Sequence, residues 1–438
     1  LARGMSGTMH AVDSGASGMR RICRIVTVAL SLSLPFGAYE VAGLSVVNVA
    51  IISSLVFTYV YLAFHGTVRR HNALPLWIAA FFLALNVVAT FEAVNPIPHI
   101  SFMVTLTGAV AVFTMSVIFA DDRKMLDYVC RGLFVSALVA TAGAAVQGTL
   151  GGAGIFPSQI DRSRIGDIPR VVGFIVTHGL YAQLVAGGAL IAFSGVLPTR
   201  GPRVFSRKVA LLALVVSVVG IVFSQSRSQM LGTAAGFAVF ALLSTLYLRG
   251  WRRGLLMTVI VLGAIGLSIV IVPLAMTLIA MSPINVVRRF EGYDVAIDLI
   301  RRYPVTGVGR YAFIEMVGGD HVLHNTFLSV GVSTGIPGMV VLFVLMATAT
   351  IRGFRGVLRR DDVTPVAIGL LSAFTAIFVV ANLYDGLNAP IYWVVMALLM
   401  NIPFIPEART AVPGRQPAAA RATAPPTTPV PELSRSEV

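Results

Sequence analysis

Apolar stretches long enough to cross a membrane recur along most of the chain. A bilayer core of about 30 Å needs roughly 20 apolar residues in a helix, and about twelve windows meet this requirement. They lie at 22–39, 41–64, 74–91, 100–120, 128–147, 171–194, 209–224, 229–247, 255–281, 326–350, 364–383 and 389–405. Of the 438 residues, 56% are hydrophobic and only 12% are charged, which excludes a soluble globular protein. We therefore expect an all-α, polytopic integral membrane protein with about 12 transmembrane helices.

Basic residues gather in every second loop between these windows, and short loops rich in Lys and Arg stay in the cytoplasm. The basic loops contain Arg69, Arg70, Arg123, Lys124, Arg200, Arg203, Arg207, Lys208, Arg249, Arg252, Arg253, Arg352, Arg355, Arg359 and Arg360. Both termini are then cytoplasmic. Residues 1–21 form a short N-terminal segment and 22–407 the membrane domain. Residues 408–438 are rich in Pro, Ala and Thr, which predicts a disordered cytoplasmic tail.

Composition excludes several other classes. The net charge of +14 largely reflects the basic cytoplasmic loops, and the chain offers too little soluble mass for nucleic-acid binding. The two cysteines, Cys23 and Cys130, lie in or beside membrane windows and predict neither a disulfide nor a metal site. We interpret the first window as an uncleaved membrane anchor, because no signal-peptidase site followed by a soluble domain is present.

Nine arginines fall in the remaining loops, which the alternation places outside the cytoplasm. They are Arg162, Arg164, Arg170, Arg227, Arg288, Arg289, Arg301, Arg302 and Arg310. Because this is the side that disfavours basic residues, their presence indicates an anionic ligand at the outer membrane face. The planar guanidinium fork suits phosphate oxygens better than the point charge of lysine does.

Five of these arginines lie in one long outer loop, 282–325, which we expect between the ninth and tenth membrane helices. If 286–302 is a helix, its apolar residues Val287, Phe290, Ile297 and Ile300 share a face, as in a helix lying at a membrane surface. The loop is the largest outside the membrane. We predict that it is the catalytic loop.

Helical spacing separates paired arginines from isolated ones. Arg301 and Arg302 have Asp298 at i−3 and i−4, and Arg288 has Glu291 at i+3. Arg289 has no acidic residue at these offsets. Arg227 is more isolated, because no Asp or Glu occurs from Ile168 to Phe290. We expect these two arginines to bind a substrate or lipid phosphate.

A histidine and an asparagine stand where this loop meets the first turn of the tenth apolar window, in Val322-Leu-His-Asn-Thr-Phe327. A neutral histidine near pH 7 suits deprotonation of a hydroxyl group. The alternative for His324 is a local role at the helix start, with Asn325 as a capping residue. His321 lies in a glycine-rich stretch and is interpreted as a loop residue.

Several of these motifs together resemble the O-antigen ligase and polymerase family of bacterial surface polysaccharide assembly. They are Arg289-x-x-x-Tyr293, Pro304, Gly307-Val-Gly309, His324-Asn325, Gly335 and Gly338, with Ser224-Gln-Ser-Arg-Ser228 and Arg170-Val-Val-Gly173 upstream. The resemblance covers about 168–345. One departure is Tyr293, where the family often has tryptophan; both are amphipathic aromatic residues suited to a membrane interface.

The resemblance implies a metal-independent glycosyltransferase, without a cofactor, in the bacterial inner membrane with its site facing the periplasm. The donor would be a glycan on undecaprenyl pyrophosphate, and the acceptor a lipid A core sugar or a growing polysaccharide. By residue-wise transfer, His324 would be catalytic and Arg227 and Arg289 would bind pyrophosphate. We name Arg170, Arg288, Tyr293, Arg310 and Asn325 as accessory candidates.

Three functions remain open at this point: an O-antigen ligase, an O-antigen or exopolysaccharide polymerase, and a transporter or flippase of polyprenyl-linked cargo. The first two share donor and leaving group, so the same residues serve both. A transporter should carry ionisable or helix-breaking residues near mid-bilayer. Here the arginines lie at the outer rim, which favours an enzyme. No residue identifies a protein partner or an oligomeric state.

Overall fold

The computed structural model describes residues 2–36, 39–41, 44–65, 68–150, 161–165, 168–175, 177–199, 201–250, 253, 283–310, 312–313, 323–384 and 386–406. Three sequence predictions lie outside the described residues: the apolar window at 255–281, the loop position of His321, and the tail from 408 onward.

The described chain is built almost wholly from helices. They are α1 (Ala2–Ser33), α2 (Val46–His65), α3 (Arg70–Phe91), α4 (Pro96–Phe119), α5 (Arg123–Leu150), α6 (His178–Phe193), α7 (Arg207–Ser224), α8 (Arg227–Tyr247), α10 (Pro283–Arg302), α12 (Thr326–Arg359), α13 (Thr364–Tyr384) and α14 (Pro390–Asn401). Within the described residues, nine of these are long and apolar enough to cross a membrane. This is a multi-pass membrane protein.

Three of the predicted windows differ from these nine. The window 22–39 falls on the last part of α1 and on the turn that follows it, and α1 is not one of the nine spans. The window 389–405 forms a shorter apolar helix, Pro390–Phe404. The window 255–281 is the one outside the described residues. The sixth span also begins later than predicted, at His178, because Gly173 has a positive φ of 61° and interrupts the chain.

Two short hairpins add a small β component that the all-α prediction lacked. Strand β1 (Glu40–Val41) pairs with β2 (Leu44–Ser45), and β3 (Asp161–Ile165) pairs with β4 (Ile168–Arg170), both antiparallel. Both occur in loops between helices. They leave the helical architecture unchanged.

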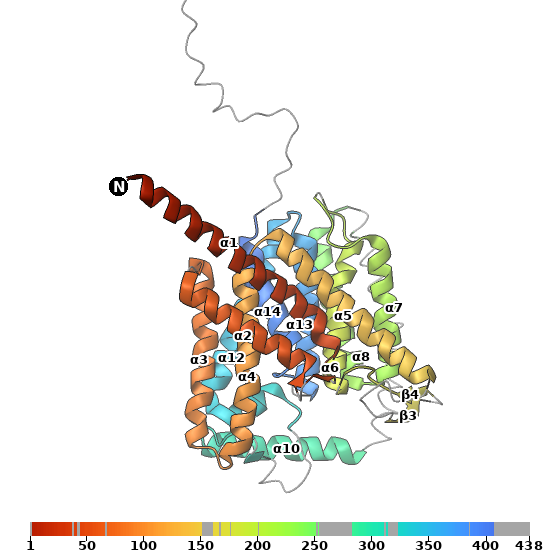
Figure 1. The fold of residues 1–438 in the computed structure, drawn as a ribbon. Coiled ribbons are helices and arrows are strands. Elements are labelled where there is room, and N and C mark those ends of the chain that lie inside the picture. The colour runs from red at the N-terminus through yellow and green to blue at the C-terminus, as the bar shows by residue number, and fades with distance from the viewer. Residues whose placement is uncertain are drawn as a thin grey trace, which may run out of the picture.

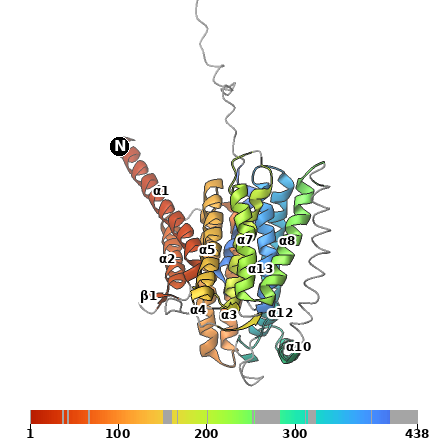
Figure 2. The same cartoon turned by 90° about the vertical axis from the view of Figure 1, so that its right-hand side faces the viewer.

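The spanning helices stand side by side, and α10 lies across one end of the bundle, roughly perpendicular to them (Figure 1). The view from the side shows α7, α8 and α13 running along the bundle with α10 below (Figure 2). Helices α13 and α14 form the interior; among the largest fully buried side chains are Trp393 and Tyr392 of α14. Their apolar residues on all sides match this central position.

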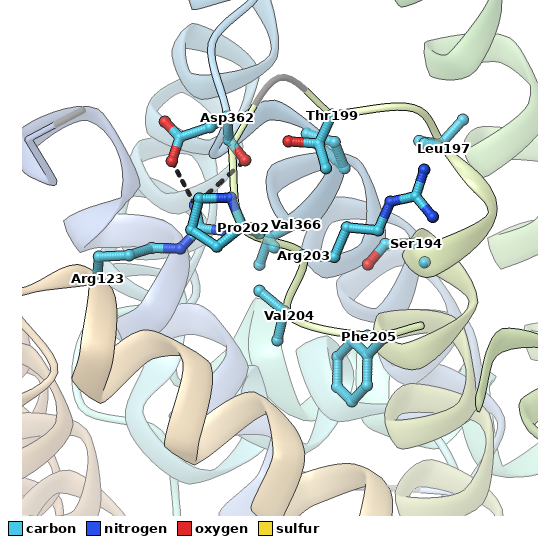
Figure 3. Close-up of a pocket in the computed structure, with 12 residues that line it drawn as sticks. Arg123, Ser194, Leu197, Thr199, Pro202, Arg203, Val204, Phe205, Asp362 and Val366 are labelled. Carbon is cyan, nitrogen blue, oxygen red and sulfur yellow. Dashed lines mark hydrogen bonds and ion pairs between the residues drawn. The ribbon is translucent and has the colours of Figure 1, made fainter. Parts of the chain in front are cut away.

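Acidic and basic side chains pair at the end of the bundle opposite α10, where the basic loops meet. Asp121 lies 3.2 Å from Arg24 and 3.0 Å from Arg69. Arg123 lies 2.9 Å from Asp127 and 3.6 Å from Asp362, and it also donates to the carbonyl of Pro202. Figure 3 shows Arg123, Pro202 and Asp362 converging from three segments. The predicted alternation of the loops between two ends is therefore present in the fold.

Helix α12 is interrupted at Gly335, which has φ 69° and ψ −168° and is followed by Pro337. Because Pro337 cannot donate, carbonyl groups near the break lose helical partners. Backbone donors from the preceding loop take their place: Val308 donates to Val332 (2.8 Å) and Gly309 to Ser333 (3.3 Å). A Cβ at Gly307 would lie 2.5 Å from the Ser333 carbonyl carbon. The predicted close backbone approach at Gly307-Val-Gly309 is confirmed, and it joins the outer loop to α12.

Candidate functional site

Helix α10 carries the first part of the site, and its two faces differ from the simplest prediction. Gly292, Ala296 and Leu299 are buried against the protein, whereas Phe290 and Ile297 are 63% and 38% exposed. The small residues allow close packing onto the bundle end. The exposed apolar residues on a helix that lies across that end fit a membrane surface, as the sequence predicts.

The arginines of α10 fall into paired and unpaired groups. Arg302 lies 2.7 Å from Asp298, as the i−4 spacing predicts. Arg301 makes no ion pair among the described residues; it instead borders a hollow of about 460 Å³ between α10 and α12 that is otherwise lined by apolar side chains. Arg289 is exposed, and no described carboxylate lies within ion-pair distance of it. The isolation that spacing predicts for Arg289 thus holds for the part of the chain that the structure describes.

His324 lies two residues before α12 and is half-buried. Its ring stacks on Tyr384 with centroids 5.8 Å apart. Burial lowers the pKa of the His324 imidazole from its ordinary value of 6.5, and the positive charge of Arg289 lowers it further; a hydrogen bond to the backbone of Tyr384 acts in the opposite direction. The ring is therefore neutral at pH 7. The electrostatic effect also means that Arg289 and His324 face the same space.

One ring nitrogen of His324 is available for chemistry. Nδ1 is buried and has no hydrogen-bond partner among the described residues. Because the ring bonds to the Tyr384 backbone, the other nitrogen, Nε2, holds the proton in the neutral form. Nδ1 then carries the lone pair. This is the arrangement that a general base requires.

Backbone contacts hold His324 in place from both sides. The hydroxyl of Tyr293, one helical turn after Arg289 on α10, donates to the His324 carbonyl at 3.3 Å. Asn325 is the N-cap of α12, and its Oδ1 accepts from the backbone N–H of Leu328 at 3.0 Å. The capping role that the sequence offered as an alternative for this pair therefore belongs to Asn325. The His324 ring is left free of that duty.

Arg227 is the first residue of α8, whose N-cap is Ser226. Further along α8, Gly232 packs against Ala376 and Val380 of α13, where an added Cβ would meet Val380 at 2.6 Å. The two helices are antiparallel, so the start of α8 lies beside the end of α13, where Tyr384 stands. The structure thus brings Arg227 to the same end of the bundle as His324.

The accessory candidates have different surroundings. The guanidinium of Arg310 lies over the ring of Phe102 at 4.2 Å, and its backbone N–H donates to His99 Nδ1 at 3.2 Å. This places Arg310 against α4. Arg170 ends β4, and Arg288 lies in α10; the side chains of both are outside the described part of the structure.

Tyr384 is the residue that sequence reasoning missed. It stacks on His324, and a Cβ at Gly179 of α6 would lie 1.7 Å from its ring. Tyr384 therefore sits between the first turn of α6 and the histidine. The available signal was an aromatic residue at the outer end of an apolar helix, where tyrosine is common for membrane reasons alone.

The donors at this end suit an anion and a proton transfer. Within the described residues, no group of three or more His, Cys, Asp or Glu side chains could hold a metal ion. Metal independence remains a prediction, because masked residues of the outer loop add further acidic groups to the sequence.

Comparison with known families gives one match. Residues 212–343 match the family model described as O-antigen ligase. The matched segment contains Arg227, Arg289 and His324 and ends in α12, whereas Arg170 lies before it. No curated protein matches the chain.

Proposed function

The chain carries an O-antigen ligase domain, and from this premise we propose that it transfers a glycan from undecaprenyl pyrophosphate to an acceptor hydroxyl. The reaction takes place at the periplasmic face of the bacterial inner membrane and needs no metal. The observation that carries the proposal is the pairing of His324 with Arg289 at the outer end of the bundle. It combines a proton acceptor with a cation that has no described carboxylate partner.

The proposed reaction uses these two groups in different ways. His324 Nδ1 takes the proton of the acceptor hydroxyl, and the resulting oxygen attacks the anomeric carbon of the donor glycan. The bond from that carbon to the pyrophosphate oxygen breaks, and the lipid pyrophosphate leaves with the electron pair. Arg289 and Arg227 stabilise the negative charge that develops on it.

The electrostatics of the site support this division. A guanidinium beside the histidine lowers its pKa, so the base is neutral when the substrates arrive. The same charge attracts the pyrophosphate. Tyr293 and Tyr384 fix the position of His324 relative to α10, which favours a preorganised site.

The acceptor distinguishes the two enzymes of this class. A ligase transfers a completed polymer to the lipid A core, and a polymerase transfers a growing chain to another lipid-linked repeat. We propose the ligase, with the polymerase as the alternative. In a deletion strain, lipid-linked polymer together with unsubstituted core would support the ligase. Single repeats attached to core would instead assign the chain as a polymerase, and unchanged surface polysaccharide would contradict both.

A purified assay tests the transfer itself. The protein in lipid nanodiscs should consume synthetic undecaprenyl pyrophosphate glycan and release undecaprenyl pyrophosphate only when an acceptor glycan is present. EDTA should leave the rate unchanged. If EDTA abolished transfer and Mg²⁺ restored it, the metal-free mechanism would be wrong.

A further inference from the structure

A separate cavity of about 340 Å³ lies between α2, α4, α6 and α14. Its walls are largely aliphatic, with Leu34, Val47 and Leu184 among them. Its polar lining residues are all uncharged: Ser45, Asn48, Thr105, Thr177 and Asn388. Because it is bordered by the first residues of α2, α6 and α14, it lies at the same end of the bundle as His324.

Asn388 supplies a buried acceptor on the wall of this cavity. Its Oδ1 atom is buried and has no hydrogen-bond partner in the part of the chain that the structure describes. The residue does not cap the following helix: the N-cap of α14 is Ala389, without a side-chain bond. A buried carbonyl oxygen is normally hydrogen-bonded, so a ligand hydroxyl or a water must reach it.

The loop that bears Asn388 is held rigidly. Gly386 donates its N–H to Thr326 Oγ1 at 3.3 Å, Ala389 donates to the Gly386 carbonyl at 3.0 Å, and Trp393 Nε1 donates to the Leu387 carbonyl at 2.7 Å. Asn388 is thus presented from a fixed turn. A preorganised acceptor loses little entropy when it binds a ligand.

The same turn connects the cavity to the reaction site. Tyr384, four residues before Asn388, stacks on His324, and Gly386 bonds to the first residue of α12. On α6, Thr177 and Leu180 line the cavity while Gly179 between them packs on the Tyr384 ring. The cavity and the histidine therefore lie on elements that meet at Tyr384.

The charge of the two regions is opposite in character. The cavity has no charged lining residue, whereas the space in front of His324 receives the charge of Arg289. An anionic group buried beside aliphatic walls without a counter-charge would be strongly destabilised. The occupant must therefore be uncharged, with an apolar part for the walls and a hydroxyl for Asn388.

We propose that this cavity binds a neutral glycolipid: a hydrocarbon segment lies on the aliphatic walls, and a sugar hydroxyl donates to Asn388 Oδ1. This deepens the proposed function and rests on it in one respect, that the glycolipid is the acceptor. Donor and acceptor then occupy separate regions, distinguished by charge. The acceptor hydroxyl approaches His324 past Tyr384.

Binding of a simple probe tests the site without the reaction. The probe is an octyl glucoside that carries a diazirine on its alkyl chain, added to the full-length protein in nanodiscs without donor. Photolabelling should map to peptides of α4 and α14, and unlabelled octyl glucoside should compete with it. Octyl phosphate, which has the same chain and an anionic head, should compete at least tenfold less well, a difference of about 1.4 kcal/mol.

Two variants examine the contacts. Asn388→Ala removes the acceptor and should weaken probe binding about tenfold, the scale of one lost hydrogen bond. Ala109→Leu places a larger side chain in the cavity from α4 and should abolish labelling. The control Asn382→Ala alters an amide whose Nδ2 bonds within its own helix to Phe378, so its probe affinity should stay within about twofold of wild type.

Unchanged affinity in Asn388→Ala, or equal competition by octyl phosphate, would overturn the proposal. The Asn388 change lies in a loop, so it remains informative if Ala109→Leu does not fold. The two proposals can also fail separately. Specific neutral binding without glycan transfer would leave the cavity assigned and remove the proposed function, while transfer with no effect of either variant on probe binding would do the reverse.

Discussion

The two ends of the helical bundle use arginine in different ways. At the end of the basic loops, Arg24, Arg69 and Arg123 each lie within 4.0 Å of an aspartate, and Asp121 is contacted from two helices. At the α10 end, the described ion pair is Arg302 with Asp298, both of which are exposed. Buried acids neutralise the first group and tie helices together. The second end keeps cationic charge facing outward.

This difference separates structural charge from functional charge. Arginines that topology retains inside the cell can be matched by local acids, because nothing else needs them. Arg289, without a described carboxylate, instead acts electrostatically on His324. A charge left in front of a buried base indicates a ligand that is itself anionic.

The first prediction concerns which end faces out, and its outcome is all or none. Val305, 68% exposed near α10, and Arg203, exposed near Arg123 at the other end, can each be replaced by Cys. In intact cells with a permeabilised outer membrane, an impermeant maleimide should label Val305→Cys and not Arg203→Cys. Both native cysteines are buried, so background labelling should be low. The reverse pattern would place the site in the cytoplasm.

The next largest effect is expected at His324. His324→Ala removes the proposed base and should reduce the transfer rate about 10²–10⁴-fold, the usual scale for general acid–base catalysis. His321→Ala, a change of the same type in the same loop, should stay within a few-fold. Turnover is measured with purified enzyme and synthetic donor. Near-normal turnover by His324→Ala would leave the mechanism without a base.

Replacement of the outer arginines sharpens the contrast between paired and unpaired charge. Arg289→Lys and Arg227→Lys keep the charge but lose the fork, and each should reduce kcat/KM by about tenfold to a hundredfold, the scale of a lost charge-assisted hydrogen bond. Arg302→Lys should change it less than about threefold, because exposed pairs contribute only about 0–1 kcal/mol. Equal losses at Arg302 and Arg289 would refute the distinction.

A change at the opposite end should affect stability and not chemistry. Arg123→Ala leaves Asp362 buried without its partner, and removal of one member of a buried pair costs about 3–5 kcal/mol. Thermal unfolding in detergent should shift down markedly, while turnover well below the transition stays within about twofold. Arg302→Ala is the control for stability. Comparable unfolding shifts for both would show that the two ends are alike.

The smallest expected effect is a displacement of the pH profile. His324 must be neutral to act, so kcat/KM falls as the pH drops through its pKa. Arg289 lowers that pKa; Arg289→Gln removes the charge, raises the pKa and moves the acid limb to higher pH. Arg302→Gln should leave the limb in place, because Arg302 is exposed and paired. An unmoved limb in Arg289→Gln would mean that the two groups do not interact.

Periodic apolar windows were sufficient to predict most membrane spans, since length and hydropathy alone decide whether a helix can cross a bilayer. The windows gave poorer boundaries at α6 and at the chain's first and last segments. At Gly173 a positive φ ends the helical path, and composition does not reveal that. Local spacing likewise predicted the Arg302–Asp298 pair correctly, because i,i+4 neighbours on a helix meet in any context.

The site divides along the same line. The residue types, their order and the position of His324 at a helix start were readable from the sequence, because they depend on local chemistry and chain position. The stacking of Tyr384 on His324, the approach of Arg289, and the unpartnered Oδ1 of Asn388 required the tertiary structure. These contacts join residues from separate helices, and their geometry follows from how α6, α10, α12 and α13 pack, which no local pattern encodes.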